Sequence, residues 1–215
     1  MASAVDKEQI EMLSQLWKDY GRGILIAVII GLGVGLGWKY WYQHKNVYRA
    51  QSSVAYQQFY SATVMRNDKA AATYLTNLKT KFKDSPYASM GALLNARVNA
   101  EEGNAKEALT QLQWVIDNSK MASFREMARI RSAQILLSIK QYSEASNILQ
   151  VVDDKSYQPM LDNVKGDIYA AQGEKEKSEQ AYQAAKTGFE SMGLNNPILD
   201  MKLSGGADNM SVGSN

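Results

Sequence analysis

The stretch that decides the fold is Pro159–Glu190, PMLDNVKGDIYAAQGEKEKSEQAYQAAKTGFE. Its apolar residues recur at helical spacing on both sides of Gly173, which predicts two helices joined by a short turn. Gly166 falls on the first helix, and Tyr182 and Ala185 fall on the second, where the two helices would meet. Closely crossing helices leave no room for longer side chains, so small residues are needed there. The segment therefore predicts one helix–turn–helix unit.

The pattern around this turn recurs along the chain. A small residue occupies the same place after four successive turns, at Ala72, Ala108, Ala145 and Ser178. The steps between them are 36, 37 and 33 residues (108−72, 145−108, 178−145), close to the period of about 34 residues in tetratricopeptide repeats. The spacing predicts an all-α, tetratricopeptide-like helical-repeat (α-solenoid) domain over residues 43–203. A helical bundle without a repeat is the alternative.

Helix-ending signals and composition agree with this fold class. Ala, Leu, Lys, Glu and Gln dominate, and apolar residues do not alternate as they would in strands. Gly103 and the Asp84-Ser85-Pro86 step sit where helices should end. Residues 204–215, SGGADNMSVGSN, lack periodic apolar residues, which predicts a disordered tail.

A second feature is the apolar stretch Tyr20–Tyr42, YGRGILIAVIIGLGVGLGWKYWY. It contains sixteen successive residues without charge, Gly23–Trp38, which cover about 24 Å as a helix. Flanking cations and aromatic rings favour the membrane–water interface, so they would complete a transmembrane signal-anchor helix. We expect this interface role of Arg22, Trp38, Lys39 and Trp41. A buried core helix is the alternative. A cleaved signal peptide fits less well, because no small-residue cleavage site follows.

Small residues form a stripe inside this stretch. Gly23, Ala27, Gly31 and Gly35 recur at every fourth residue, which lets a second helix approach closely in lipid. We interpret the stripe as an intramembrane helix-packing site. Ordinary glycine enrichment of membrane helices explains the pattern equally well.

Composition excludes most kinds of chemistry. Formal net charge is +2, which gives no sign of a nucleic-acid surface, and the chain has no cysteine and a single histidine, His44. Thiolate or paired-histidine metal sites and Ser-His-Asp catalysis therefore lack their residues. Acidic pairs such as Glu101-Glu102 and Asp153-Asp154 lie at expected helix ends and turns, which is typical of solvated caps. We predict a protein that is not an enzyme, with no catalytic residue, metal or cofactor.

A stacked helical-repeat domain can bind a partner along its concave face. In the repeat register, the first helix of each pair lines this face. The polar residues expected there are Arg97, Gln134, Asn163 and Asp167.

The order of these features resembles the YfgM family of ancillary subunits of the bacterial Sec translocon. The resemblance covers most of residues 10–203, and its most specific piece is GWKYWYQHK, Gly37–Lys45. The other matching segments are Arg49-Ala50, SSVAYQ (Ser52–Gln57), YASMGALLNAR (Tyr87–Arg97), EGNAKEALTQLQWV (Glu102–Val115), MARIRSAQILLSIKQYSEA (Met127–Ala145) and VKGDIYAAQGEKEKSEQAY (Val164–Tyr182).

The resemblance implies a single-pass protein of the bacterial inner membrane. Residues 1–19 would form a short cytoplasmic arm, residues 20–42 the span, and residues 43–203 a periplasmic domain beside the Sec translocon. Charge alone does not orient the span, because the cations on its two sides balance. The implied partners are the translocon, the membrane-anchored chaperone PpiD and translocating client polypeptides, which would be passed to periplasmic chaperones. The residues themselves leave two other functions open, a cell-envelope adaptor for a division or lipoprotein-assembly partner and a self-contained holdase chaperone.

Overall fold

The computed structural model describes residues 4–204, with side chains at 17, 18, 22, 23, 25, 30–33, 36 and 38–204. The predicted tail, residues 204–215, lies outside this part of the chain except for Ser204. Residues 1–51 and 52–215 form two compact units. All regular structure within the described residues is helical, which confirms the all-α prediction.

The first unit consists of the N-terminal part of helix α1, Ala4–Val64. Helix α1 continues through residue 20, the expected boundary between the arm and the span. It then runs on to Val64, three residues before Asn67, and no glycine or proline interrupts the sequence between Trp38 and Asn67.

The expected transmembrane helix is wrong. Within the part of the chain that the structure describes, none of the helices combines the length and the apolar character that crossing a membrane requires. The uncharged stretch is short, and glycine, which adds no apolar side chain, occupies five of its sixteen positions. The expected location in the bacterial inner membrane, with a periplasmic C-terminal domain, is therefore contradicted as well.

The residues assigned to the membrane interface lie along α1, and their expected role stays a prediction. Arg22, Trp38, Lys39 and Trp41 are exposed along α1. The rings of Trp38 and Trp41 lie 5.9 Å apart between centroids. Lys45 Nζ lies 3.8 Å from the centre of the Trp41 ring, which is a local cation–π contact within the helix.

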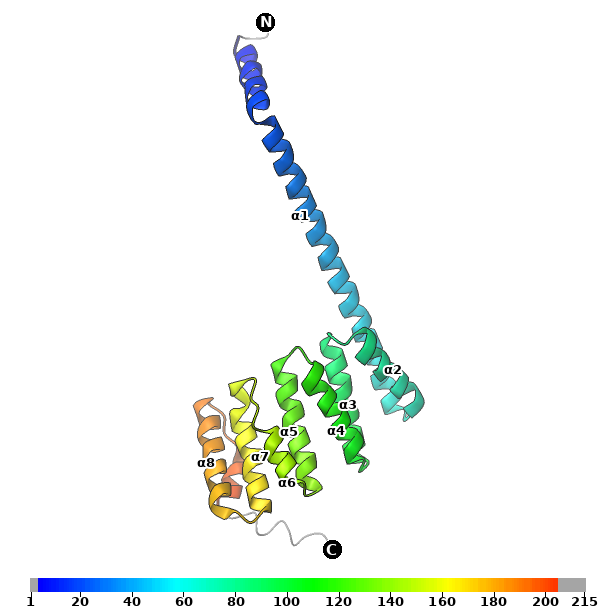
Figure 1. Ribbon diagram of the computed structural model, residues 1–215, viewed down its shortest axis with the longest axis vertical. Helices are drawn as coiled ribbons and strands as arrows, with labels where there is room; N and C mark the ends of the chain where they lie inside the picture. Colours follow the sequence, from blue (N-terminus) through cyan, green and yellow to red (C-terminus); the bar gives the residue numbers. More distant parts are fainter. Residues whose placement is uncertain (1–3, 205–215) are drawn as a thin grey trace. The chain divides into compact units, whose positions relative to one another are not determined.

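The second unit is a series of short helices that begins with the last turns of α1 (Figure 1). The helices that follow are α2 Asp68–Lys81, α3 Pro86–Glu101, α4 Ala105–Asn118, α5 Ala122–Ser138, α6 Tyr142–Ile148, the 3₁₀ turn η1 Lys155–Tyr157, α7 Gln158–Ala171, α8 Lys175–Ser191 and α9 Pro197–Leu203.

Capping residues explain where several helices begin and end. The side chains of Asn67, Ser85 and Asn196 accept hydrogen bonds from backbone N–H groups in the first turns of α2, α3 and α9. Gly103 and Gly173 follow α3 and α7 with φ of 81° and 78°, a left-handed conformation that glycine adopts without strain. Both glycines and the Asp84-Ser85-Pro86 step therefore end or start helices where the sequence predicted.

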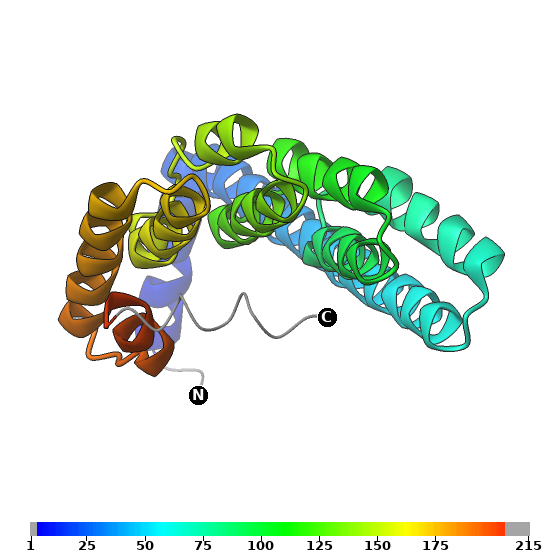
Figure 2. The same ribbon diagram turned by 90° about the horizontal axis from the view of Figure 1, so that it is seen from below.

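Helices α3/α4, α5/α6 and α7/α8 form consecutive antiparallel pairs, and α1/α2 precede them. In Figure 2, α3, α5 and α7 lie in one layer and α2, α4 and α6 in the other. We call the surface of α3, α5 and α7 that faces away from the second layer the first-helix face. This arrangement confirms the tetratricopeptide-like prediction.

The repeated small residue occupies the fourth position of each second helix. Ala108, Ala145 and Ser178 are buried at this position in α4, α6 and α8. In α2 the position belongs to Ala71, which is buried, whereas Ala72 is exposed. The expected place of Ala72 was therefore wrong by one residue.

The last pair packs as its sequence predicted. A Cβ atom added to Gly166 would lie 2.4 Å from the Tyr182 ring, and Ser178 Oγ donates a 3.0 Å hydrogen bond to the Gly166 carbonyl. The α5/α6 pair is less regular, because α6 has only seven residues and an irregular segment leads from it to η1.

Candidate functional site: the first-helix face

The structure brings two of the four predicted face residues together. Arg97 on α3 and Gln134 on α5 line one pocket of about 310 Å³. The floor of this pocket is apolar and its rim is polar. The residues that line it are Ala96, Arg97, Ala100, Leu112, Arg131, Gln134, Ile135 and Ser138.

Arg131 is the residue that the sequence analysis missed. Arg131 lies three residues before Gln134, so the two side chains share one face of α5. This spacing is the sequence signal from which Arg131 could have been predicted together with Gln134. Partial burial and the neighbouring positive charge of Arg97 lower the pKa of Arg131. The two guanidinium groups therefore repel each other across the pocket.

These two arginines have little compensating negative charge. Arg97 Nε lies 2.8 Å from Glu101 Oε1, but both side chains are more than 60% exposed, so solvent screens the pair. Within the described residues, no carboxylate lies within ion-pair distance of Arg131. The pocket is consequently an electropositive site with an apolar floor.

The other two predicted residues, Asn163 and Asp167 on α7, contact the chain's own helix α9. Lys202 Nζ donates to Asn163 Oδ1 at 3.0 Å and forms an ion pair with Asp167. The hydroxyl of Tyr182 also donates to Asp167 Oδ1, at 2.8 Å. Burial and the Asp167 carboxylate raise the pKa of Tyr182.

Helix α9 is fixed at this end by apolar contacts as well. Leu199 is buried among Tyr182, Ala185 and Phe189. Asp200 Oδ1 forms an ion pair with Lys186 Nζ on α8, at a distance of 2.6 Å. The first-helix face is therefore open at Arg97 and Gln134 and covered at Asn163 and Asp167. Whether any of the four binds a partner remains a prediction.

Two larger pockets lie along the second helices. One, of about 790 Å³, is lined by residues from α1 to α4, and the other, of about 800 Å³, by residues from α2 and α4 to α6. Lys79 lines both, donates to Gln111 Oε1 at 2.9 Å and lies 5.0 Å from the centre of the Trp114 ring. Burial lowers the pKa of Lys79. Its ammonium group therefore already has one hydrogen bond and one aromatic ring as partners within the chain.

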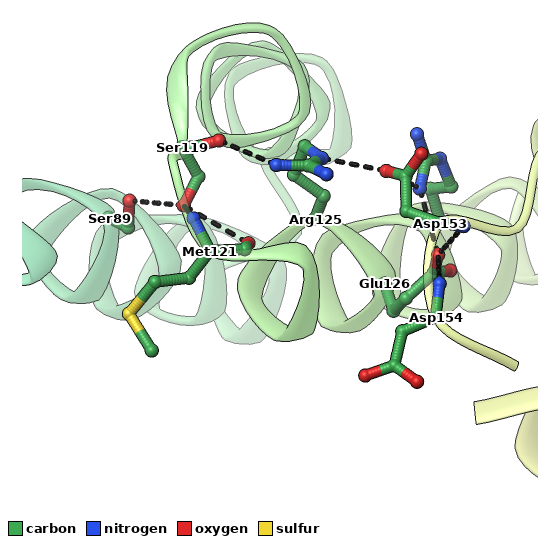
Figure 3. Close-up of polar contacts among 8 residues, drawn as sticks. Ser89, Ser119, Met121, Arg125, Glu126, Asp153 and Asp154 are labelled. Carbon is green, nitrogen blue, oxygen red and sulfur yellow. Dashed lines mark hydrogen bonds and ion pairs between the residues drawn. The ribbon is translucent and has the colours of Figure 1, made fainter. Parts of the chain in front are cut away.

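A buried acid on α5, Glu126, joins the α5/α6 pair to the irregular segment that follows it (Figure 3). Its Oε1 atom accepts hydrogen bonds from the backbone N–H groups of Asp153 and Asp154, the latter at 3.2 Å, and from Arg129 Nη1 at 3.1 Å. Its Oε2 atom is buried without a hydrogen-bond partner in the described part of the chain. Glu126 thus fixes the irregular segment at Asp153 and Asp154 to helix α5.

Arginines extend this network in both directions (Figure 3). Arg125 Nε and Arg129 Nη1 lie 2.7 and 2.8 Å from Asp153 Oδ2, and these hydrogen bonds lower the pKa of Asp153. Arg125 also donates to the Ser119 carbonyl at 2.9 Å, and Ser119 Oγ lies 3.0 Å from Ser89 Oγ on α3. Asp153 is exposed, as expected, but it pairs with two arginines and caps no helix. Asp154 caps η1, because its side chain accepts a hydrogen bond from the Ser156 N–H group.

Two residues of the small-residue stripe on α1, Gly23 and Gly31, belong to the described part of the chain. A Cβ atom added to Gly23 or Gly31 would meet nothing within 4 Å. Ala27 and Gly35 lie outside the residues whose side chains are described. The helix-packing role of the stripe stays a prediction.

Metal chemistry has no candidate in the described residues, since no group of three or more His, Cys, Asp or Glu side chains could hold an ion. The face offers binding chemistry instead, through two guanidinium groups, one amide and an apolar floor.

A family model of the tetratricopeptide repeat-like domain matches residues 14–208. The chain belongs to this family. The chain is also similar to several proteins named ancillary SecYEG translocon subunit. The protein of Haemophilus influenzae is 25% identical over 94% of this chain and 98% of its own length. That of Neisseria gonorrhoeae is 25% identical over the same shares, and that of Escherichia coli is 20% identical over 83% of this chain and 86% of its own.

These matches confirm the resemblance to the ancillary translocon subunits and cover nearly the whole tetratricopeptide-like domain. No solved structure matched the chain.

Proposed function

We propose that this chain is an ancillary subunit of a Sec translocon. Its tetratricopeptide-like domain would bind newly translocated polypeptides on the first-helix face and pass them to chaperones, with PpiD as the first partner. The observation that carries this proposal is the open electropositive pocket at Arg97 and Gln134 in a chain whose relatives are named translocon subunits.

The geometry suits transfer better than storage. The pocket of about 310 Å³ lies at the small end of the range for ligand sites, so it takes one or two side chains. Contacts of this size give modest affinity, because binding must first offset the loss of translational and conformational freedom. A polypeptide held in this way can leave for a second chaperone.

We further propose that the translocon contacts α1 at its small-residue stripe. Changing Gly23 and Gly31 together to leucine should reduce recovery of the translocon with the affinity-tagged full chain. The physical reason is that leucine side chains keep a packed helix at a distance. Neither glycine has a neighbour that a Cβ would meet, so the change should leave the chain itself intact.

The matched control is Gly33→Leu, which lies about 160° from Gly31 around α1 and where a Cβ also meets nothing within 4 Å. We expect unchanged recovery with this control. Equal recovery with all three proteins would remove the stripe from the proposal. Failure of the unaltered chain to recover any translocon subunit would remove the proposed function.

A further inference from the structure

We infer that Arg97, Arg131 and Gln134 bind the carboxylate of an aspartate or glutamate next to an aliphatic residue, within an internal segment of the bound polypeptide. The inference rests on the proposed function and names the sequence that its binding face prefers. Its first support is charge. Two guanidinium groups of neighbouring helices converge on one pocket, and Arg131 has no carboxylate within ion-pair distance in the described chain.

Mutual repulsion makes this pocket selective for an anion. Arg131 is half-buried, so its charge is less screened than that of a fully exposed side chain. A carboxylate between the two guanidinium groups would turn the repulsion into two charge-assisted hydrogen bonds. The exposed amide of Gln134 lies on the same rim and can donate a further bond.

The floor specifies what must accompany the carboxylate. The buried Ala96 and Leu112 and the half-buried Ile135 give the pocket an apolar base. Burial of an aliphatic side chain there gains free energy in proportion to its apolar area. A volume of about 310 Å³ accepts one such side chain together with one carboxylate, but not a long peptide segment.

The proposed function decides between an internal acid and a chain terminus. A polypeptide that is still being translocated presents internal segments, whereas its C-terminal carboxylate arrives last. The occupant is therefore an acidic side chain beside an aliphatic one. The other end of the first-helix face is not available for this ligand, because Lys202 already contacts Asn163 and Asp167 there.

The test measures binding of short dye-labelled peptides to the full chain by fluorescence anisotropy. Three peptides share Gly-Ser flanks. One has a central Leu-Glu and blocked ends, one has Leu-Gln and blocked ends, and one has no acidic side chain but a free C-terminal leucine. We expect the Leu-Glu peptide to bind about tenfold more tightly than either of the others, as loss of a charge-assisted contact predicts. Added salt should shrink this difference.

Variants assign the preference to the pocket. Arg131→Gln should abolish the difference between Leu-Glu and Leu-Gln, and Arg131→Glu should make a Leu-Lys peptide the tightest ligand. Lys175→Gln removes the same charge from an exposed position on α8 and should change nothing. Thermal unfolding of Arg131→Gln should occur at or above the temperature of the unaltered chain, because one like-charge contact is lost.

Equal binding of Leu-Glu and Leu-Gln, or tightest binding of the free C-terminus, would overturn the inference. Either result leaves the proposed function standing, provided that the chain still recovers the translocon. Loss of that recovery tests the proposed function separately.

Discussion

Glu126→Ala should lower the free energy of unfolding by about 3–5 kcal/mol, the range for removing one partner of a buried ion pair. Glu126 is completely buried, and Arg129 beside it is 8% exposed. Without the carboxylate, the N–H groups of Asp153 and Asp154 lose their acceptor and Arg129 keeps only Asp153. Urea denaturation followed by circular dichroism measures the change.

Two controls separate burial from charge in this experiment. Glu101→Ala removes the acid of an exposed pair with Arg97 and should cost about 0.5 kcal/mol or less. Glu126→Gln keeps an acceptor oxygen but loses the charge, so its effect should lie between the two alanine variants. A cost for Glu126→Ala as small as that for Glu101→Ala would contradict the network in Figure 3.

Gly166→Ala should destabilise the domain by about 1–3 kcal/mol, the usual cost of overpacking. The new methyl group would lie 2.4 Å from two atoms of the Tyr182 ring. The Tyr182 ring cannot move away easily, because its hydroxyl is hydrogen-bonded to Asp167 and Lys202 Nζ lies over its face. Alanine otherwise favours a helix over glycine, so a loss of stability identifies the close crossing.

Gly91→Ala provides the comparison. Its methyl group would lie 3.1 and 3.3 Å from the ends of Leu78 and Leu75, which can shift because leucine tips are flexible, and at an ordinary contact distance of 3.6 Å from the Phe59 ring. We expect little change or a small gain. Adding Tyr182→Leu to Gly166→Ala should recover part of the loss, because neighbouring substitutions are not additive. A Gly166→Ala protein as stable as Gly91→Ala would show that α7 and α8 do not approach as described.

Local signals predicted much of the fold. Gly103, Gly173 and Ser85 each have a conformational or capping role that depends on a few adjacent residues, so the sequence located the turns. The Gly166–Tyr182 contact was also predictable because both residues lie in one helix pair. The choice of Ala72 over Ala71 failed because two adjacent alanines look alike until the start of the helix is known.

Long-range contacts explain the other misses. Glu126 lies between arginine and methionine in a helix with many polar residues, and its partners at Asp153 and Asp154 are 27 and 28 residues away. The residues next to Asn163 and Asp167 in the sequence do not predict their contact with Lys202, which belongs to α9. The span failed for a different reason. Its flanking aromatic rings matched an interface, but its uncharged core was too short and too rich in glycine.

The central claim is that the first-helix face receives polypeptides at the translocon. The most direct measurement places a photo-crosslinking amino acid at Gln134, which is exposed on α5, or at Gln183, which is exposed on α8. Each full-length protein is then irradiated with translocons that hold an arrested polypeptide. Crosslinks to the polypeptide from position 134 and few or none from position 183 are the predicted result. Equal crosslinking from both positions, or crosslinking from position 183 alone, would contradict the account.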